Sequence, residues 1–269
     1  MSEKTPAWLT ARPIAHRGLH DAAKGRVENT LGAAEAAIAG GYAIECDVQL
    51  SRDGEAVVFH DATLSRLTHT RGAVSQKTVA DIQAARLRDS SETIPTLPQL
   101  LARIAGRTPL ICEIKSDFDG DLRLTDRVAE IARAYEGPIA LKSFDPAPIA
   151  HLRAQRAEIG PLGIVAEASY RGAYWRALSM AQKAACEAFL HYSETQPDFL
   201  SWRIEDLPHS TPFLLRQIEG LPVMTWTVRT AEQRRAAARW SDQVVFEGDA
   251  LSESPHNATE ERNAGLEDL

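Results

Sequence analysis

The stretch AIECDVQL at residues 43–50 decides the fold of this chain, because it sets two carboxylates into an apolar run. Side chains two positions apart in a strand share a side, so Glu45 and Asp47 point one way and Cys46 the other. An exposed face on an edge strand is the alternative interpretation. The apolar neighbours favour burial instead, where unpaired acids would be costly, and two carboxylates that converge at a strand end invite a hard cation.

Short apolar runs of this kind alternate along the chain with longer segments of helical period, which is the pattern of a parallel sheet with crossover helices. The predicted strands are Pro13–His16, Ala43–Leu50, Ala56–His60, Leu110–Lys115, Ile139–Ser143, Gly163–Glu167, Phe199–Ile204, Val223–Val228 and Gln243–Phe246. A closed eightfold barrel holds one strand fewer than this. We interpret the last run as the extra segment.

Helical patterns separate these strands. Leu31, Ala34 and Ile38 share a face that ends at Gly40-Gly41, while Thr78 and Thr96 are predicted N-caps. Further helices are predicted at Leu122–Tyr135, Pro146–Arg156, Trp175–His191, Thr211–Glu219 and Thr230–Trp240. The sequence shows no repeat and no interdomain linker, so residues 1–251 are predicted to form one domain. Residues 252–269 are polar and are predicted to be a disordered tail.

Composition narrows the range of functions. A chain of 269 residues can bury one large core. The net charge of −7 lacks the basic footprint of nucleic-acid binding. Three cysteines in no metal-type spacing are expected to be reduced and structural. No secretory signal or membrane-length apolar stretch is apparent, so we expect a cytoplasmic protein without stable membrane association.

A second strand repeats the alternation of charged residues. Glu113 and Lys115 are again two apart, which adds a third carboxylate and a cation at the end of a strand. Oxygen ligands without a cysteine or histidine cluster favour Mg²⁺ or Ca²⁺ over Zn²⁺. One divalent cation is therefore the expected cofactor, although Lys115 could simply pair with Glu113.

Two histidines end predicted strands. His16 follows the first and His60 the third, and parallel strand ends open on the face where barrel active sites lie. Two imidazoles near one metal can divide the work of general base and general acid. Arg17 can meet a phosphate oxygen in a bidentate way, and Lys115 can add a point charge. Structural histidines and solvated bases are the alternatives.

Nine short motifs occur in an order that resembles the glycerophosphodiester phosphodiesterase family. They are His16-Arg17-Gly18, Glu28-Asn29-Thr30-Leu31, Glu45-x-Asp47-Val48, Asp53-Gly54 with Val57-Val58-Phe59-His60-Asp61, Leu64-Ser65-Arg66, Ile94-Pro95-Thr96-Leu97, Glu113-Ile114-Lys115, Ser143-Phe144 and Trp226-Thr227-Val228. Together they span residues 13 to 248.

The resemblance implies an α/β fold, a TIM-type (β/α)8 barrel, and metal-dependent hydrolysis of small glycerophosphodiesters to sn-glycerol 3-phosphate and an alcohol. It implies that His16 and His60 are the catalytic pair and that the metal ligands are Glu45, Asp47 and Glu113. It also implies phosphate contacts for Arg17 and Lys115, a supporting or substrate-contacting acid at Glu28, and an aromatic pocket wall at Trp226.

The chain departs from the family pattern at two late places. Arg229 replaces the usual asparagine after Trp-Thr-Val, and Phe246-Glu247-Gly248 replaces a Thr-Asp pair. Arg229 is expected either to contact a second anionic group of the substrate or to pair with Glu247. The alcohol moiety, the nucleophile (water or the glycerol 2-hydroxyl), the acid and base roles of the histidines and the oligomeric state stay open.

Two other functions compete with this prediction. The same barrel could act on a phospholipase D-like or inositol-phospholipid-like substrate, but the acidic balance and the lack of a basic amphipathic helix disfavour it. A non-catalytic binding barrel is disfavoured because a decayed site has no physical reason to keep every metal and histidine position.

Overall fold

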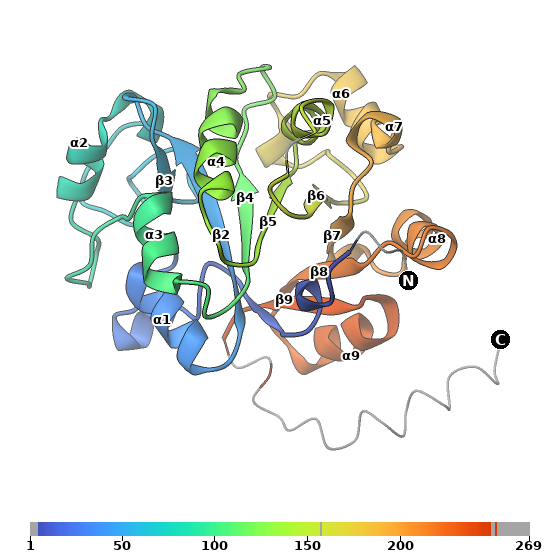
Figure 1. Ribbon diagram of the computed structural model, residues 1–269, viewed down its shortest axis with the longest axis horizontal. Coiled ribbons are helices and arrows are strands. Elements are labelled where there is room, and N and C mark those ends of the chain that lie inside the picture. Colours follow the sequence, from blue (N-terminus) through green and yellow to red (C-terminus); the bar gives the residue numbers. More distant parts are fainter. Residues whose placement is uncertain (1–4, 157, 249–250, 252–269) are drawn as a thin grey trace.

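Eight parallel strands close into a barrel in the computed structural model, which describes residues 5–156, 158–248 and 251 (Figure 1). The strands are β1 (Ile14–Ala15), β2 (Ala43–Leu50), β4 (Leu110–Ile114), β5 (Ile139–Ser143), β6 (Leu162–Ala166), β7 (Phe199–Arg203), β8 (Val223–Val228) and β9 (Gln243–Phe246). β1 pairs with both β2 and β9, and this double pairing closes the sheet. The predicted (β/α)8 barrel is confirmed.

The extra strand is β3 (Ala56–Val58), so the prediction that the last run is extra was wrong. β9 is a full barrel strand between β8 and β1. β3 pairs antiparallel with the last three residues of β2, from Val48↔Val58 to Leu50↔Ala56. Because only five residues separate β2 from β3, the chain must turn back as a hairpin, since a parallel crossover needs a dozen or more.

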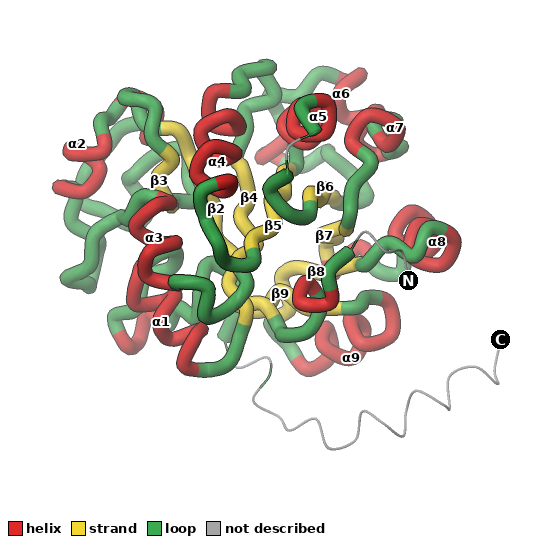
Figure 2. The backbone as a smooth tube through the Cα atoms, in the orientation of Figure 1, coloured by secondary structure: helices red, strands yellow, loops and turns green. Residues whose placement is uncertain are grey.

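Helices surround the barrel on its outside (Figure 2). The α-helices are α1 (Leu31–Ala39), α2 (Val79–Ala84), α3 (Leu97–Ile104), α4 (Arg123–Arg133), α5 (Pro146–Ala154), α6 (Met180–Glu187), α7 (Tyr192–Thr195), α8 (Ser210–Ile218) and α9 (Ala231–Trp240). Short 3-10 turns occur at Ala7–Leu9, Ala22–Lys24, Val74–Gln76, Ala173–Trp175 and Ile204–Asp206. Within the described residues, no helix has the length and apolar character needed to cross a membrane.

Side-chain caps set several helix starts. Thr78 and Thr96 each cap a helix through a reciprocal capping box, as predicted. The single helix predicted over Trp175–His191 was wrong, because Ser179 forms another capping box and starts α6 there. α7 then follows as a separate short helix. The predicted tail at 252–269 lies outside the described residues.

The barrel has an apolar layer inside one end and a polar layer above it. An interior cluster contains Leu9, Ile14, Ala43, Ile111, Ala140, Phe199, Met224 and Val245. Phe199 fills the barrel so tightly that a Cβ at Gly163 would lie 2.3 Å from its ring. Alternation along the strands then directs Glu45, Glu113 and Lys142 to the same interior. Outward residues, including the buried free thiols Cys46 and Cys112, pack under the helices.

Candidate active site

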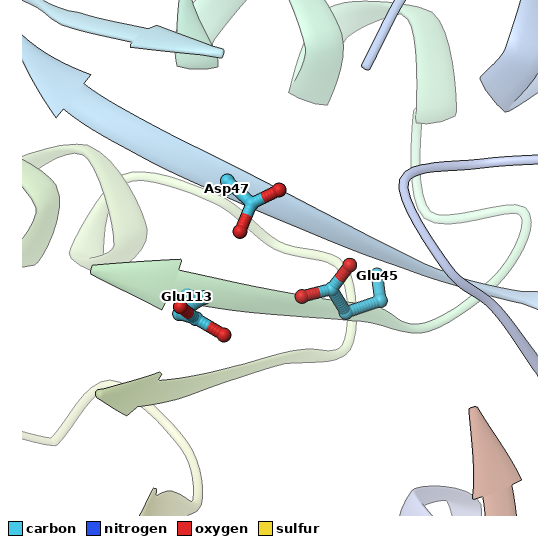
Figure 3. A group of neighbouring side chains, drawn as sticks. All are labelled: Glu45, Asp47 and Glu113. Atoms are coloured by element: carbon cyan, nitrogen blue, oxygen red, sulfur yellow. The ribbon is translucent and has the colours of Figure 1, made fainter. Parts of the chain in front are cut away.

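Three buried carboxylates meet inside the barrel, above its apolar layer. Glu45 and Asp47 come from β2 and Glu113 from the adjacent β4, where Asp47 is in register with Glu113 (Figure 3). One oxygen of each lies within 4.8 Å of the others, and the residues are at most 5% exposed. We call these three residues the carboxylate trio. The interpretation of residues 43–50 as a buried strand is correct.

Two buried lysines neutralise much of this charge. Lys115 Nζ lies 2.7 Å from Asp47 Oδ1 and also contacts Glu113. Lys142 on β5 lies 3.0 Å from Glu45 Oε1 and 3.4 Å from Glu113 Oε2. Burial alone would lower the pKa of each lysine, but the neighbouring carboxylates raise it, so both stay charged.

The cations in turn keep two members of the trio, Asp47 and Glu113, ionised. Burial alone would raise the pKa of Asp47, yet Lys115, His60 and Arg17 hold it well below its usual range. Lys115 and Lys142 likewise lower the pKa of Glu113 against its burial. Asp47 and Glu113 are therefore anionic at neutral pH.

The His16-Arg17-Gly18 turn delivers groups from β1 into the site. Arg17 has a positive φ of 56°, and Gly18 follows at 77°, where a Cβ would also meet the Ala33 backbone at 2.8 Å. In this conformation the Arg17 amide donates to Glu45 Oε2 at 3.1 Å. Non-glycine residues rarely adopt this left-handed conformation, and strained backbone of this kind is concentrated at functional sites.

Asn29 anchors Asp47 from the loop before α1. Its Nδ2 donates to Asp47 Oδ2 at 3.0 Å, and its Oδ1 accepts from the Asp47 amide at 3.3 Å. Asn29 also has a positive φ of 58°, which asparagine tolerates better than most residues. Asn29 lies in one of the nine motifs, but the sequence predicts no role for it.

Glu28 joins two arginines. Arg17 Nη1 donates to its Oε1 at 2.7 Å, and Arg66 donates to both oxygens at 2.7 and 2.9 Å. Arg17 Nε lies 3.4 Å from Asp47, so the guanidinium bridges Glu28 and the trio. Burial opposes the effect of Arg66 and Arg17, which together lower the pKa of Glu28.

His60 reaches the site by a different path from the predicted one. It follows β3, which is antiparallel, so the expectation that it ends a parallel strand was wrong. The hairpin brings it back beside Asp47, whose carbonyl accepts from the Phe59 amide at 2.9 Å. His60 Nδ1 lies 2.8 Å from Asp61 Oδ1, and Asp61 in turn accepts from Arg66 Nε.

His16 has an acid partner too. Its Nδ1 lies 2.5 Å from Glu247 Oε1, while its Nε2 faces Glu45 Oε2 at 3.8 Å. Arg229 Nε donates to Glu247 Oε2 at 2.7 Å. Of the two expectations for Arg229, the structure shows the pairing with Glu247. Burial opposes the contacts with His16, His20 and Arg229, which depress the pKa of Glu247 far below its usual range.

Trp226 belongs to an aromatic cluster. Trp226 on β8 is partly buried and donates from Nε1 to the Ser201 carbonyl at 2.8 Å. Its ring centroid lies 5.4 Å from that of Phe144, which lies 5.0 Å from Trp175. The role of Trp226 as an aromatic wall of the substrate pocket stays a prediction.

Several residues of the site were not predicted from the sequence. Lys142, Arg66, Asp61 and Asn29 received no role, although all lie in or next to quoted motifs or predicted strands. Lys142 had a usable signal, since alternation with Ala140 points it into the barrel. Arg66 had none, because its partners Glu28 and Asp61 come together only in the folded chain.

The trio fits a hard divalent cation. It offers carboxylate oxygens alone, which suit Mg²⁺ or Ca²⁺. Glu45 Oε1 is buried, and its contact is the ion pair with Lys142 Nζ at 3.0 Å. Such an oxygen is available as a ligand.

Barrel and acidic site together define a (β/α)8 protein with its polar groups at one end of the barrel. The profile of the glycerophosphoryl diester phosphodiesterase family matches residues 16–247. The chain belongs to this family.

Individual proteins with this family's name resemble the chain in sequence and in structure. A glycerophosphodiester phosphodiesterase of Caldanaerobacter subterraneus is 38% identical over 142 residues, which are 49% of this chain and 57% of the relative. The chain spans about half the length of the curated relatives it matches. A Silicibacter pomeroyi structure assigned to the glycerophosphoryl diester phosphodiesterases has a TM-score of 0.67 at 27% identity, covering 87% of this chain and 89% of that one.

An Oleispira antarctica phosphodiesterase, solved with the product sn-glycerol-3-phosphate, has a TM-score of 0.66 at 21% identity and covers 87% of this chain and 91% of that one. At that identity the likeness concerns the fold alone. It places this chain among barrels of the same architecture.

Proposed function

We propose that this protein is a phosphoric diester hydrolase that cleaves glycerophosphodiesters to sn-glycerol 3-phosphate and an alcohol. His16 and His60 act as its acid and base. One observation carries the proposal: two histidines with acid-partnered Nδ1 atoms flank a buried carboxylate trio. Membership of the family supports the choice of substrate.

The trio would hold one divalent cation, Mg²⁺ or Ca²⁺, through Glu45, Asp47 and Glu113. When bound, such a cation polarises a phosphoryl oxygen and helps to ionise a nucleophile. Lys115 and Lys142 offset part of the negative charge of the trio. The three buried carboxylates therefore do not depend on the cation alone to stay close together.

The histidines carry the protons. An acid at Nδ1 fixes the tautomer and orientation of an imidazole and leaves Nε2 for the reacting groups. One histidine removes the proton of the nucleophile, and the other protonates the departing alcohol. Arg17 and Lys115 face the same space and stabilise the charge that develops on the phosphoryl oxygens.

Trp226 and its aromatic neighbours form the apolar border of the substrate site, next to the charged groups. Glu28 acts indirectly, because it holds Arg17 in position and is itself held by Arg66. Arg229 is not assigned to the substrate, since its Nε is paired with Glu247.

The test is release of sn-glycerol 3-phosphate from a panel of glycerophosphodiesters, including glycerophosphocholine. Purified protein is assayed with chelator and again after Mg²⁺ or Ca²⁺ is restored. We expect turnover that chelator abolishes and one of the two cations restores. Cleavage of lipid vesicles alone would favour the inositol-phospholipid or phospholipase D-like function, and turnover of no diester with either cation would favour a binding barrel.

A further inference from the structure

The two departures from the family pattern lie in one row at the polar end of the barrel. β9 lies between β1 and β8. His16 directly follows β1, Glu247 follows β9 and Arg229 follows β8, all at the same end of the barrel. The His16 amide donates to the Phe246 carbonyl at 3.0 Å, and the Glu247 amide donates to the Val228 carbonyl at 3.1 Å. The backbone therefore fixes their order across the sheet.

Each oxygen of Glu247 has its own partner. Oε1 lies 2.5 Å from His16 Nδ1, and Oε2 accepts from Arg229 Nε at 2.7 Å. The Glu247 side chain is 18% exposed and that of His16 is 10% exposed, so water competes little for the contact between them. A carboxylate held at both oxygens cannot rotate without breaking one of the two contacts.

Arg229 is itself held in place from the backbone. Its amide donates to Gln233 Oε1 at 2.8 Å, at the capped start of α9. The Arg229 side chain is 52% exposed, so the guanidinium lies at the rim while its Nε reaches inward. Arg229 is therefore well placed to hold the Glu247 carboxylate in position.

We propose that Glu247 is a positioning residue for His16 and that Arg229 holds Glu247, so that the two departures form one coupled unit. Glu247 accepts from Nδ1 and directs Nε2 of His16 toward the trio, where the reacting groups bind. This inference rests on the proposed function for its kinetic consequences, but the geometry of His16 can be tested without turnover.

The first test is nuclear magnetic resonance of protein labelled with ¹⁵N-histidine. His16, assigned with a His16→Gln variant, should show a protonated Nδ1 in the native protein. In Glu247→Gln this signal should shift or vanish. Glu35→Gln is the matched control, because the Glu35 side chain is 46% exposed and accepts from Arg107 at both oxygens, outside the barrel and apart from His16 and Arg229. An unchanged His16 signal in Glu247→Gln, with the protein folded, overturns the inference whether or not the protein is a hydrolase.

The second test is a double-mutant cycle with the residues that the family pattern carries. Glu247→Gln should lower kcat by about 10- to 100-fold and leave KM within about twofold. Glu247→Asp and Arg229→Asn should each lower kcat, whereas the double variant should be more active than Glu247→Asp alone. Strictly additive losses, or an effect on KM alone, would overturn the coupling. An inactive native protein would refute the proposed function and leave the spectroscopic test decisive.

Discussion

Two groups of residues support the two histidines, and they are built differently. The His60 arm consists of His60, Asp61, Arg66 and Glu28. Its acid partner is the next residue in the chain. The His16 arm consists of His16, Glu247 and Arg229, and its acid partner is 231 positions away. The two arms reach the same chemical arrangement, an imidazole with an acid at Nδ1.

The difference lies in how each arm depends on the fold. Asp61 stays next to His60 even in an unfolded chain, and a local hairpin brings both to Asp47. Glu247 meets His16 only when β9 closes the barrel against β1. We infer that the His16 arm forms only when the barrel closes. The His60 arm depends in addition on Arg66, which is linked through Glu28 to Arg17.

The largest expected effect separates the chemical roles of the arms. His16→Ala and His60→Ala should each lower kcat on glycerophosphocholine by on the order of 10²–10⁴. On a glycerophosphodiester with a p-nitrophenol leaving group, the variant that lacks the general acid should recover most of its activity, because that leaving group departs without a proton. Steady-state kinetics on both substrates measures this.

The outcome assigns one arm to the acid and the other to the base. Circular dichroism controls for folding. Full activity of both alanine variants on glycerophosphocholine would show that neither arm carries the reaction.

The second effect concerns Lys142, which contacts Glu45 and Glu113 of the trio. Lys142→Met leaves Glu45 and Glu113 with less positive charge, and breaking a buried pair costs about 3–5 kcal/mol of unfolding free energy. With chelator present, urea unfolding should show this loss. Saturating divalent cation should restore more stability to the variant than to the native protein.

Lys24→Met is the matched control for Lys142, since the Lys24 side chain is 70% exposed. Its substitution should change stability by less than about 0.5 kcal/mol. Equal losses in the two variants would contradict the role of Lys142.

A third histidine, His191, lies in a different environment. Nδ1 of the buried His191 contacts a hydroxyl, Thr195 Oγ1 at 3.3 Å, rather than a carboxylate. Burial lowers the pKa of His191 to about 4 from an ordinary value of 6.5. The unfolded chain therefore takes up this proton first as pH falls, and stability present above pH 6.5 is lost between pH 6.5 and 4.

A difference of about 2.5 pH units corresponds to about 3 kcal/mol. Urea unfolding of the native protein and His191→Gln from pH 7 to 4 should reveal it as a loss of stability that is larger in the native protein than in the variant. The exposed His69 provides a control through His69→Gln. Parallel curves for the native protein and His191→Gln would refute the assignment.

The smallest expected effects separate the roles of Asp61 and Arg66 in the His60 arm. Asp61→Asn should lower kcat by about tenfold, because the acid that orients His60 loses its charge. Arg66→Met should instead act mainly on KM, since it releases Glu28 and thereby Arg17. Steady-state kinetics separates the two. An identical pattern in both variants would show that the arm does not divide in this way.

Much of the site follows from local rules. Alternation in a strand pairs Glu45 with Asp47 and Glu113 with Lys115, and the apolar neighbours require these strands to be buried. The capping residues Thr78 and Thr96 were predictable for the same reason, since a cap satisfies amides within one turn. These features depend on contacts over a few residues.

The sequence by itself therefore determined the strand composition, the acid cluster and the resemblance to a phosphodiesterase family. Only the tertiary structure decided that β9 closes the barrel and that β3 is the extra hairpin strand. It also decided that Arg229 binds Glu247 and that Lys142 joins the trio. Such pairings join residues far apart in the chain, and their geometry exists only after the barrel has closed.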